Sequence, residues 1–175
     1  MSKQRAVIWD LDGTLADDQA RAHFLEVEEG RERDWHSYFD AIEEDPPIAA
    51  SIAILHALHK DGFRVIFLTG RPEYTRPGTE RWLTANGLED YDRLLMRPEG
   101  EHRPAGEFKI EVVDGLRDEY DVLCAFEDRI DVAEHLRNGG VPVFLYGAGA
   151  EAAAEALEIL DIEQAELSED SSGGG

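Results

Sequence analysis

Four short apolar runs constrain the fold of this chain more than any other feature of its sequence. Each is four to six residues long, and they cover residues 6–9, 65–68, 122–126 and 141–146. Continuous apolar runs of this length are typical of strands in a parallel sheet that is covered on both faces. Residues 94–96 form a weaker fifth candidate. The runs therefore predict four or five buried parallel strands.

Between these runs, apolar residues recur with helical spacing. After Pro47 they return every three or four positions as far as Leu58, and Asp61-Gly62 then ends the pattern. Similar spacing predicts three more helices, at about residues 78–85, 107–120 and 130–137. Strands and helices that alternate in this way favour an α/β fold with a Rossmann-like, doubly wound parallel sheet.

The length of 175 residues suits one compact domain, which we expect to span residues 1–162. Residues 17–46 interrupt the alternation of strands and helices, and we interpret them as a small helical insertion over the site in place of a large cap domain. Residues 163–175 are acidic and end in Ser-Ser-Gly-Gly-Gly. This composition predicts a disordered tail.

The chain is strongly acidic, because 39 Asp and Glu oppose 17 Lys and Arg and give a net charge of −22. Acids occur in every segment between the predicted strands, so we interpret them first as a solvated surface. Among the basic residues, 14 are Arg and 3 are Lys. Such a surface suits concentrated salt, where screening over roughly 3 Å at 1 M weakens self-repulsion. Halophilic adaptation is therefore a hypothesis, and a thermal melt in molar KCl and in dilute buffer tests it.

The cysteine content and the start of the chain indicate the compartment. Cys124 is the single cysteine, so no disulfide forms within one chain, and its apolar neighbours predict a buried strand position. Only four apolar residues stand directly before Asp10, too few for a secretory signal or a membrane span. We expect a soluble, cytoplasmic protein that does not associate with membranes.

Polar residues follow three of the predicted strands. Asp10 and Asp12 come after the first, Thr69-Gly70-Arg71 after the second, and Glu127-Asp128 after the run at 122–126. In an open parallel sheet, ligands bind outside the carboxyl ends of the strands. These groups are therefore expected to meet at one site.

Asp10 and Asp12 suit a two-step transfer of phosphate. A carboxylate such as Asp10 can attack phosphorus and form an acyl phosphate. Asp12, two residues later, can protonate the leaving oxygen and then deprotonate the hydrolytic water. Gly13 permits a tight turn, and Thr14 offers a hydroxyl group. The competing interpretation is a plain Asp-Gly turn after a strand.

The second strand end and one lysine suit the binding of phosphate. Thr69 offers a hydroxyl group, Gly70 an unobstructed backbone N–H, and Arg71 a planar charged fork. Lys109, near the start of a predicted helix, can reach back to the phosphoryl group and the attacking carboxylate. The competing interpretations are a Thr cap before Pro72 and a solvated surface lysine.

Glu127 and Asp128 are candidates to hold Mg²⁺ against Asp10, because magnesium binds a few carboxylates together with water and substrate phosphate. Asp128 alternatively caps the helix that begins near Ile130. The six histidines form no convincing set of metal ligands, and no zinc pattern is present.

The order of these elements resembles the four motifs of haloacid dehalogenase (HAD) superfamily phosphatases: Asp10-Leu11-Asp12-Gly13-Thr14, Thr69-Gly70-Arg71, Lys109 and Glu127-Asp128. The resemblance implies a HAD-type fold and a Mg²⁺-dependent phosphatase. It implies that Asp10 is the nucleophile and that Asp12 is the general acid and base, with a backbone carbonyl that also binds Mg²⁺. Dehalogenases lack the second Asp, so Asp12 favours a phosphatase.

A narrower resemblance is to the phosphatase domain of bacteriophage-type polynucleotide kinase/phosphatase, and it extends to Arg97, to His102-Arg103 and to Phe126-Glu127-Asp128-Arg129. That family removes 3′-phosphate from nucleic-acid ends, and the resemblance implies that Arg21 and Arg71 contact the substrate phosphate. Glu127 stands where the family usually has Asp, which leaves open whether it ligates Mg²⁺ or only Asp128 does. No lysine follows a glycine, so the chain has no P-loop, and a kinase or ligase would be a separate partner.

Two alternatives to a polynucleotide 3′-phosphatase stay open. One is a phosphatase that acts on small nucleotides or sugar phosphates, since a protein with a charge of −22 repels a polyanion. A local cluster of arginines could still form a positively charged opening to the site. The candidates are Arg71, Arg76, Arg81, Arg97, Arg103 and Arg129. The other alternative is a binding module without catalysis, which the full set of catalytic groups disfavours.

Overall fold

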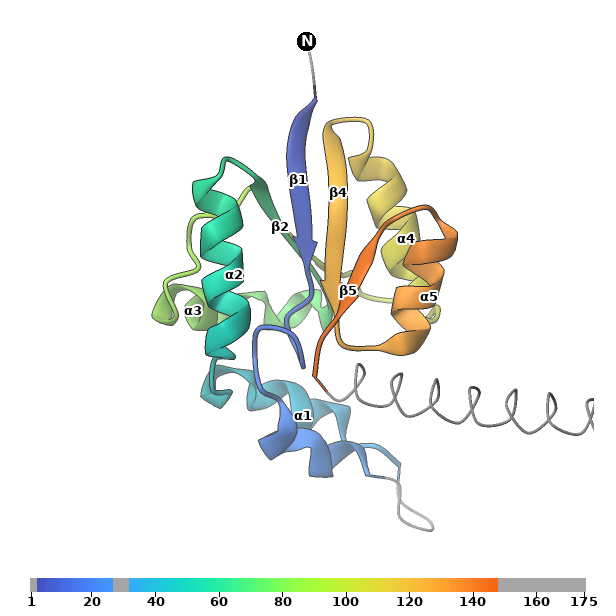
Figure 1. Cartoon of the computed structure of the whole chain (residues 1–175). Helices are drawn as coiled ribbons and strands as arrows, with labels where there is room; N and C mark the ends of the chain where they lie inside the picture. The colour runs from blue at the N-terminus through green and yellow to red at the C-terminus, as the bar shows by residue number, and fades with distance from the viewer. Residues whose placement is uncertain (1–2, 27–31, 148–175) are drawn as a thin grey trace, which may run out of the picture.

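A parallel sheet of five strands forms the centre of the protein in the computed structural model, which describes residues 3–26 and 32–147 (Figure 1). The strand order is β3-β2-β1-β4-β5, and every pair is parallel. The strands are β1 Gln4–Trp9, β2 Arg64–Pro72, β3 Arg93–Arg97, β4 Tyr120–Glu127 and β5 Val143–Leu145. The predicted α/β class and all five predicted strands are therefore confirmed.

Helices cover both faces of this sheet, as the continuous apolar strands predict. On one face α2 (Ala49–Lys60) and α3 (Arg76–Ala85) pack against a core that includes Val7, Trp9 and Phe67. On the other face α4 (Ala105–Leu116) and α5 (Ile130–Asn138) pack against Ile8 and Leu68. Successive residues of β1 and β2 thus enter opposite cores, because side chains alternate along a strand. Figure 1 shows the two helix pairs on either side of the sheet.

Two details of the prediction were wrong. The third predicted helix was expected to reach Tyr120, but α4 ends at Leu116, because Tyr120 already pairs with β1 as the first residue of β4. The runs at 122–126 and 141–146 were expected to be covered throughout. Leu123 is nevertheless 48% exposed and Phe144 58% exposed. β5 is a short edge strand that pairs only with Ala125–Glu127, so this side of the sheet is less fully covered.

In its described residues, 17–26 and 32–46, the segment predicted as a helical insertion contains three short helices: η1 Gln19–Leu25, α1 Trp35–Asp40 and η2 Ile42–Glu44. It lies below the carboxyl ends of the strands in Figure 1. Its two ends meet in a neck, where Asp17 N–H donates to the Pro46 carbonyl over 2.8 Å and Ile48 N–H donates to the Leu15 carbonyl over 2.8 Å. These two hydrogen bonds fix the insertion at the carboxyl end of the central strand β1.

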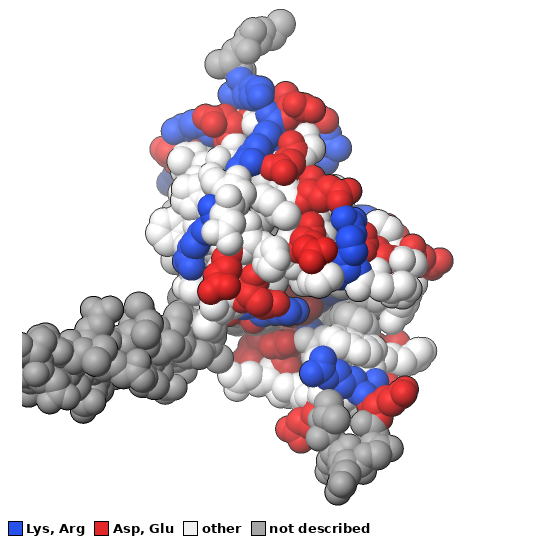
Figure 2. Space-filling model, turned by 90° about the vertical axis from the view of Figure 1, so that its right-hand side faces the viewer, with Lys and Arg blue, Asp and Glu red and all other residues white. Residues whose placement is uncertain are grey.

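The predicted tail at 163–175 lies outside the described residues. Within the described ranges, none of the helices combines the length and the apolar character needed to cross a bilayer. Figure 2 shows Asp and Glu interspersed with Lys and Arg over one face of the molecule. Several of these charges form exposed pairs, such as Arg81 with Glu43 and Arg93 with Glu119.

Candidate active site

A pocket of about 800 Å³ lies between the carboxyl ends of the strands and the insertion. Several of the predicted site residues line it directly: Asp10, Asp12, Gly70, Lys109 and Asp128. The remaining predicted residues are buried behind this wall: Arg21, Thr69, Arg71 and Glu127. The tertiary structure therefore brings together side chains that are up to 118 residues apart, from Asp10 to Asp128.

Lys109 links two of the carboxylates at the base of the pocket. Its ammonium group donates to Asp10 Oδ1 over 2.7 Å and to Glu127 Oε2 over 2.7 Å. All three side chains are buried. Burial alone would lower the pKa of Lys109, but the carboxylates of Asp10 and Glu127 outweigh it and raise this pKa. Lys109 thus stays charged and fixes one oxygen of Asp10.

Burial and the carboxylate of Glu127 raise the pKa of Asp10 to about 7, although Lys109 opposes the shift. The pKa of Asp128 is raised to about 9 by burial and by the nearby Asp10 and Glu127. Burial is the larger cause of both shifts, and crowding adds to it, because one oxygen from each of these three acids lies within 4.8 Å of the others. A single lysine does not balance three carboxylates, and a divalent cation would.

The donor set fits such a cation. Asp128 Oδ1 is buried and has no hydrogen-bond partner among residues 3–26 and 32–147, so one carboxylate oxygen is available to a ligand. Hard oxygen donors of this kind suit Mg²⁺. The turn at Gly13 lets the backbone of the first motif approach this carboxylate: its φ is +75°, and a Cβ there would lie 2.3 Å from Asp128 Oδ2. Only glycine accommodates this approach without displacing Asp128.

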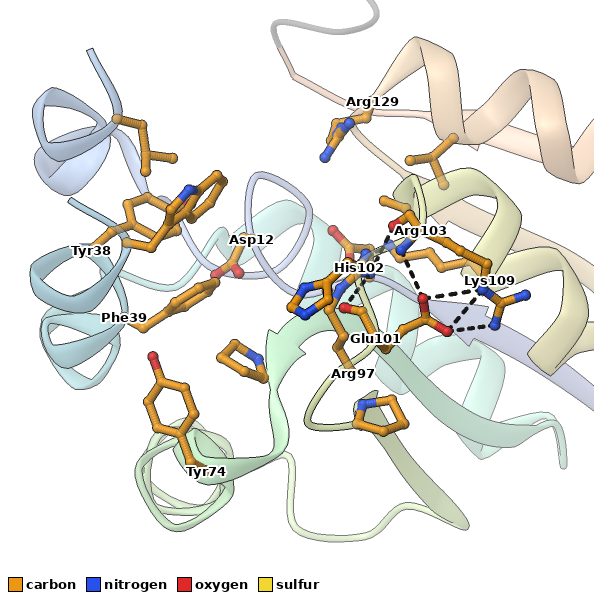
Figure 3. A pocket seen from close by; sticks show the side chains of 18 of the residues that line it. Asp12, Tyr38, Phe39, Tyr74, Arg97, Glu101, His102, Arg103, Lys109 and Arg129 are labelled. Carbon is orange, nitrogen blue, oxygen red and sulfur yellow. Dashed lines mark hydrogen bonds and ion pairs between the residues drawn. The ribbon is translucent and has the colours of Figure 1, made fainter. Parts of the chain in front are cut away.

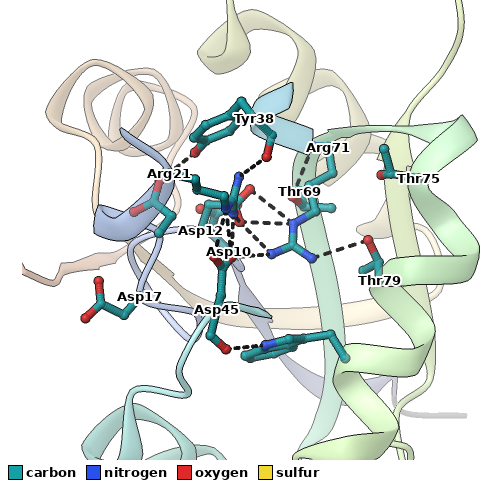
Figure 4. A network of polar contacts seen from close by, with 12 residues as sticks. Asp10, Asp12, Asp17, Arg21, Tyr38, Asp45, Thr69, Arg71, Thr75 and Thr79 are labelled. Atoms are coloured by element: carbon teal, nitrogen blue, oxygen red, sulfur yellow. Dashed lines mark hydrogen bonds and ion pairs between the residues drawn. The ribbon is translucent and has the colours of Figure 1, made fainter. Parts of the chain in front are cut away.

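Asp12 is held by two buried arginines (Figure 4). Arg71 Nη2 donates to Asp12 Oδ1 over 2.6 Å, Arg71 Nε donates over 3.0 Å, and Arg21 Nη2 donates to the same oxygen. Burial alone would raise the pKa of Asp12, but Arg71 and Arg21 outweigh it and lower this pKa. The predicted contact of Arg21 and Arg71 with substrate phosphate stays a prediction, and here both guanidinium groups hold Asp12.

Thr69 is fully buried, and its Oγ1 accepts a hydrogen bond from the backbone N–H of Arg71 over 3.1 Å. This contact lies in the last part of β2, where the register with β3 shifts between Leu68 and Pro72, and the Arg71 side chain there reaches Asp12. Arg71 Nη1 also donates to Thr79 Oγ1 over 3.3 Å, which ties the arginine to α3. The irregular end of β2 is therefore fixed by these hydrogen bonds, and Gly70 in it lines the pocket.

Two residues of this network were missed by sequence reasoning, Asp45 and Tyr38. Asp45 accepts from Arg21 Nε over 2.8 Å and from Arg21 Nη2 over 2.7 Å, and it is buried. The Tyr38 ring lies under the Arg21 guanidinium at 4.0 Å, and the Tyr38 hydroxyl donates to Asp18 over 2.5 Å. Neither residue belongs to a local motif. The one signal in the sequence for the Arg21–Asp45 pair is their placement, because Arg21 lies near the start of the insertion and the acid Asp45 lies near its end.

The predicted arginine cluster divides into two groups. Arg97, Arg103 and Arg129 line the pocket together with His102. The other three face elsewhere: Arg71 lies behind Asp12, Arg76 pairs with Glu73, and Arg81 pairs with Glu43. Three of the six expected arginines therefore lie at the pocket, where Arg103 pairs with Glu101 and Glu111 and Arg129 pairs with Asp131.

Comparison with known proteins agrees with this geometry. The family described as the polynucleotide kinase PNKP phosphatase domain matches residues 4–150. None of the curated protein sequences matches the chain significantly. A chain in the structure of the Pnkp1/Rnl/Hen1 complex is similar, with 30% identity and a TM-score of 0.67. The match covers 84% of this chain and 48% of that one.

A second structure, of the Pnkp1/Rnl/Hen1 RNA repair complex, is similar at 30% identity and a TM-score of 0.67, over 85% of this chain and 44% of that one. This chain thus spans about half the length of these relatives. The class C acid phosphatase from Bacillus anthracis shares the fold, with 17% identity and a TM-score of 0.62, over 83% of this chain and 67% of that one. With its family match from residue 4 to residue 150, the chain belongs to the PNKP phosphatase-domain family of HAD phosphatases.

Proposed function

We propose that this chain is a Mg²⁺-dependent phosphomonoesterase that removes 3′-phosphate from nucleic-acid ends through an aspartyl-phosphate intermediate. The observation that carries the proposal is the placement of Asp10 in the pocket, with one oxygen held by Lys109 at 2.7 Å and with Asp12 on the same wall. A nucleophile, a positioned cation and a neighbouring acid are the three groups that the two-step reaction requires.

In the first step, the Asp10 oxygen that Lys109 does not hold attacks phosphorus. The bond between phosphorus and the leaving oxygen breaks, and Asp12 in its protonated form gives its proton to that oxygen. The products are the dephosphorylated 3′ hydroxyl end and a phosphorylated Asp10. The ammonium of Lys109 lies beside the attacking carboxylate, where it stabilises charge on the transferring phosphoryl group.

In the second step, the Asp12 carboxylate takes a proton from a water molecule, and that water oxygen attacks phosphorus. The bond between phosphorus and Asp10 breaks, which releases inorganic phosphate and restores the Asp10 carboxylate and the protonated Asp12. Arg21 and Arg71 each donate to Asp12 Oδ1 and lower its pKa, so they hold the charged form that acts in the second step. Protonation of Asp12 for the first step therefore requires these contacts to weaken.

Asp10, the backbone carbonyl of Asp12 and Asp128 would hold Mg²⁺, which would supply positive charge to the phosphoryl oxygens. The unpartnered Asp128 Oδ1 supports a direct role for this residue. Both oxygens of Glu127 already have hydrogen-bond partners: Oε2 accepts from Lys109 over 2.7 Å, and Oε1 accepts from the backbone N–H of Arg129 over 3.3 Å. We therefore assign Glu127 to the support of Lys109 and to the outer surroundings of the ion.

Two observations favour nucleic-acid ends as the substrate. The chain belongs to the PNKP phosphatase-domain family, and similar chains occur in an RNA repair complex. The pocket also carries the basic side chains of Arg97, Arg103 and Arg129 in a protein whose net charge is −22. Within the ranges that the structure describes, Arg97 forms no ion pair, and its Nη1 donates to the Arg103 carbonyl over 2.9 Å. Its positive charge is available to a phosphodiester.

The experiment compares three substrates with purified protein and Mg²⁺: an oligonucleotide with a 3′-phosphate, the same oligonucleotide with a 5′-phosphate, and a panel of nucleoside and sugar phosphates. We expect release of inorganic phosphate from the 3′-phosphate, loss of turnover with EDTA, and its return with Mg²⁺. Activity confined to the small phosphates would overturn the assignment in favour of a small-molecule phosphatase. Turnover that persists in EDTA would contradict the proposed dependence on Mg²⁺.

A further inference from the structure

The wall of the pocket that the insertion supplies is aromatic, in contrast to the charged strand ends. Trp35, Tyr38 and Phe39 come from α1, and Tyr74 comes from η3 (Glu73–Thr75) on the neighbouring side. We call these four residues the aromatic wall. Figure 3 shows Tyr38, Phe39 and Tyr74 on one side of Asp12, with His102, Arg103 and Arg129 on the other.

Two members of the aromatic wall expose a large apolar surface without a partner from the protein core. Trp35 is 47% exposed and Tyr74 is 52% exposed, and both lie at the pocket. Exposed aromatic side chains that gather at a concave site mark a binding surface rather than a core. The wall is also continuous with the carboxylates, because Asp10 and Asp12 line the same pocket.

The three rings of α1 are held in place before any ligand arrives. Trp35 and Phe39 stack with centroids 5.8 Å apart and an interplanar angle of 21°, and Tyr38 packs edge-on against Phe39 at 5.2 Å. Tyr38 is fixed in turn by its hydroxyl bond to Asp18 and by the guanidinium of Arg21. A fixed aromatic surface binds a flat ring at a small entropic cost.

The pocket as a whole has three kinds of surface in one volume. Carboxylates and Lys109 form its base, the aromatic wall forms one side, and Arg97, Arg103 and Arg129 lie on the other. A nucleotide end has the matching parts, namely a terminal phosphate, a flat base and a preceding phosphodiester. The volume of about 800 Å³ falls within the range of pockets that hold ligands of this size, roughly 300–1,000 Å³.

We propose that the aromatic wall binds the base of the terminal nucleotide by stacking, while the arginine side receives the preceding phosphodiester. This inference rests on the proposed function and deepens it, because it makes the phosphatase select a nucleoside phosphate over a phosphate ester without a base. Stacking on Trp35 and Tyr74 accepts any base, since every base presents a π face. The wall therefore confers a preference for a base and little preference among sequences.

The test compares two oligonucleotides with a 3′-phosphate, one with a normal terminal nucleotide and one whose terminal nucleotide lacks its base. The variants are Trp35→Ala, Tyr74→Ala and the double substitution, with Trp35→Phe as the conservative variant. Phe144→Ala is the matched control, because Phe144 is equally exposed but does not line the pocket.

For the double variant we expect kcat/KM to fall about 10-fold to 100-fold on the normal end and to change less than about 2-fold on the abasic end. Trp35→Phe should keep most of the activity, and Phe144→Ala should match the wild type on both substrates. An equal loss on both substrates would show that the wall only supports the fold of the site. Unchanged kcat/KM on both oligonucleotides would show that the aromatic wall does not bind the substrate. Either outcome overturns the inference.

A binding measurement separates this inference from the proposed function. Trp9 and Trp82 are buried, so Trp35 is the exposed tryptophan among the three in the chain. We expect a nucleoside 3′-monophosphate, added to the non-hydrolysing Asp10→Asn variant, to quench the fluorescence of Trp35, and a sugar phosphate to leave it unchanged. Quenching in a protein that fails to hydrolyse 3′ ends would contradict the proposed function alone. Hydrolysis without quenching would contradict the aromatic wall alone.

Discussion

The site has two halves of different origin, and they differ in how rigidly the fold specifies them. In the half at the strand ends, Asp10 and Asp128 directly follow β1 and β4, and Lys109 comes from α4 and donates to Asp10. The half in the insertion is built from short helices, and one buried pair, Arg21 with Asp45, joins it to Asp12. Under the proposed function, the groups for chemistry lie at the strand ends, and the insertion supplies three of the four aromatic residues proposed to bind the base.

The largest expected effect lies in the strand-end half, at Asp10. The substitution Asp10→Asn keeps the shape of the side chain and removes the nucleophile, so we expect kcat to fall by about 1,000-fold or more. The control is Asp90→Asn, which changes an exposed acid far from the pocket. Steady-state release of phosphate measures both. Full turnover by Asp10→Asn would show that another group attacks phosphorus.

Gly13→Ala is expected to have the next largest effect, because it acts on the close approach of the first motif to Asp128. The new Cβ would meet Asp128 Oδ2 at 2.3 Å, and the positive φ adds strain of about 1–3 kcal/mol. We expect activity to fall about 100-fold, with weaker apparent affinity for Mg²⁺.

Gly62→Ala is the matched control for Gly13→Ala. Gly62 also has a positive φ, +87°, but a Cβ there meets nothing within 4 Å. It should therefore reproduce the loss of stability in urea unfolding without the loss of activity. If both variants keep full activity, the contact between Gly13 and Asp128 does not matter for the metal site.

A smaller effect is expected in the insertion half, at Asp45. Asp45→Asn removes one of the two carboxylates that pair with Arg21, and we expect a loss of stability of about 1–3 kcal/mol because a buried charge loses a partner. Asp12 remains as the second partner, so activity should fall only about 10-fold. Urea unfolding and kcat on the 3′-phosphate substrate measure the two effects. A loss as large as that of Asp10→Asn would mean that the insertion takes part in the chemistry.

The smallest effect is expected at Glu43, which pairs with Arg81 at the surface of the same insertion. Exposed ion pairs contribute little, because water screens the charges and two long side chains lose freedom. Glu43→Gln should therefore leave both the unfolding midpoint and the activity unchanged. A measurable loss of activity would show that the outer contacts of the insertion, and not only Arg21 with Asp45, hold the site together.

Most of the strand-end half was predictable from the sequence. Carboxyl ends of neighbouring parallel strands meet at one edge, so residues that follow buried runs lie together whatever their separation in the chain. Asp10, Gly70 and Asp128 were placed in this way, and the structure brings them to one pocket. The exposure of Leu123 and the early end of α4 were not predictable, because both depend on how neighbouring elements cover the edge of the sheet.

The sequence by itself determined the α/β class, the order of the motifs and the kinds of group available for chemistry, because these follow from local periodicity and from the polar residues at strand ends. Only the tertiary structure decided that Asp45 pairs with Arg21, that Arg21 and Arg71 hold Asp12, and that aromatic rings face the carboxylates. The reason is physical. These contacts join residues whose separation in the sequence follows no regular pattern, and only the packing of the folded chain selects them from many possible partners.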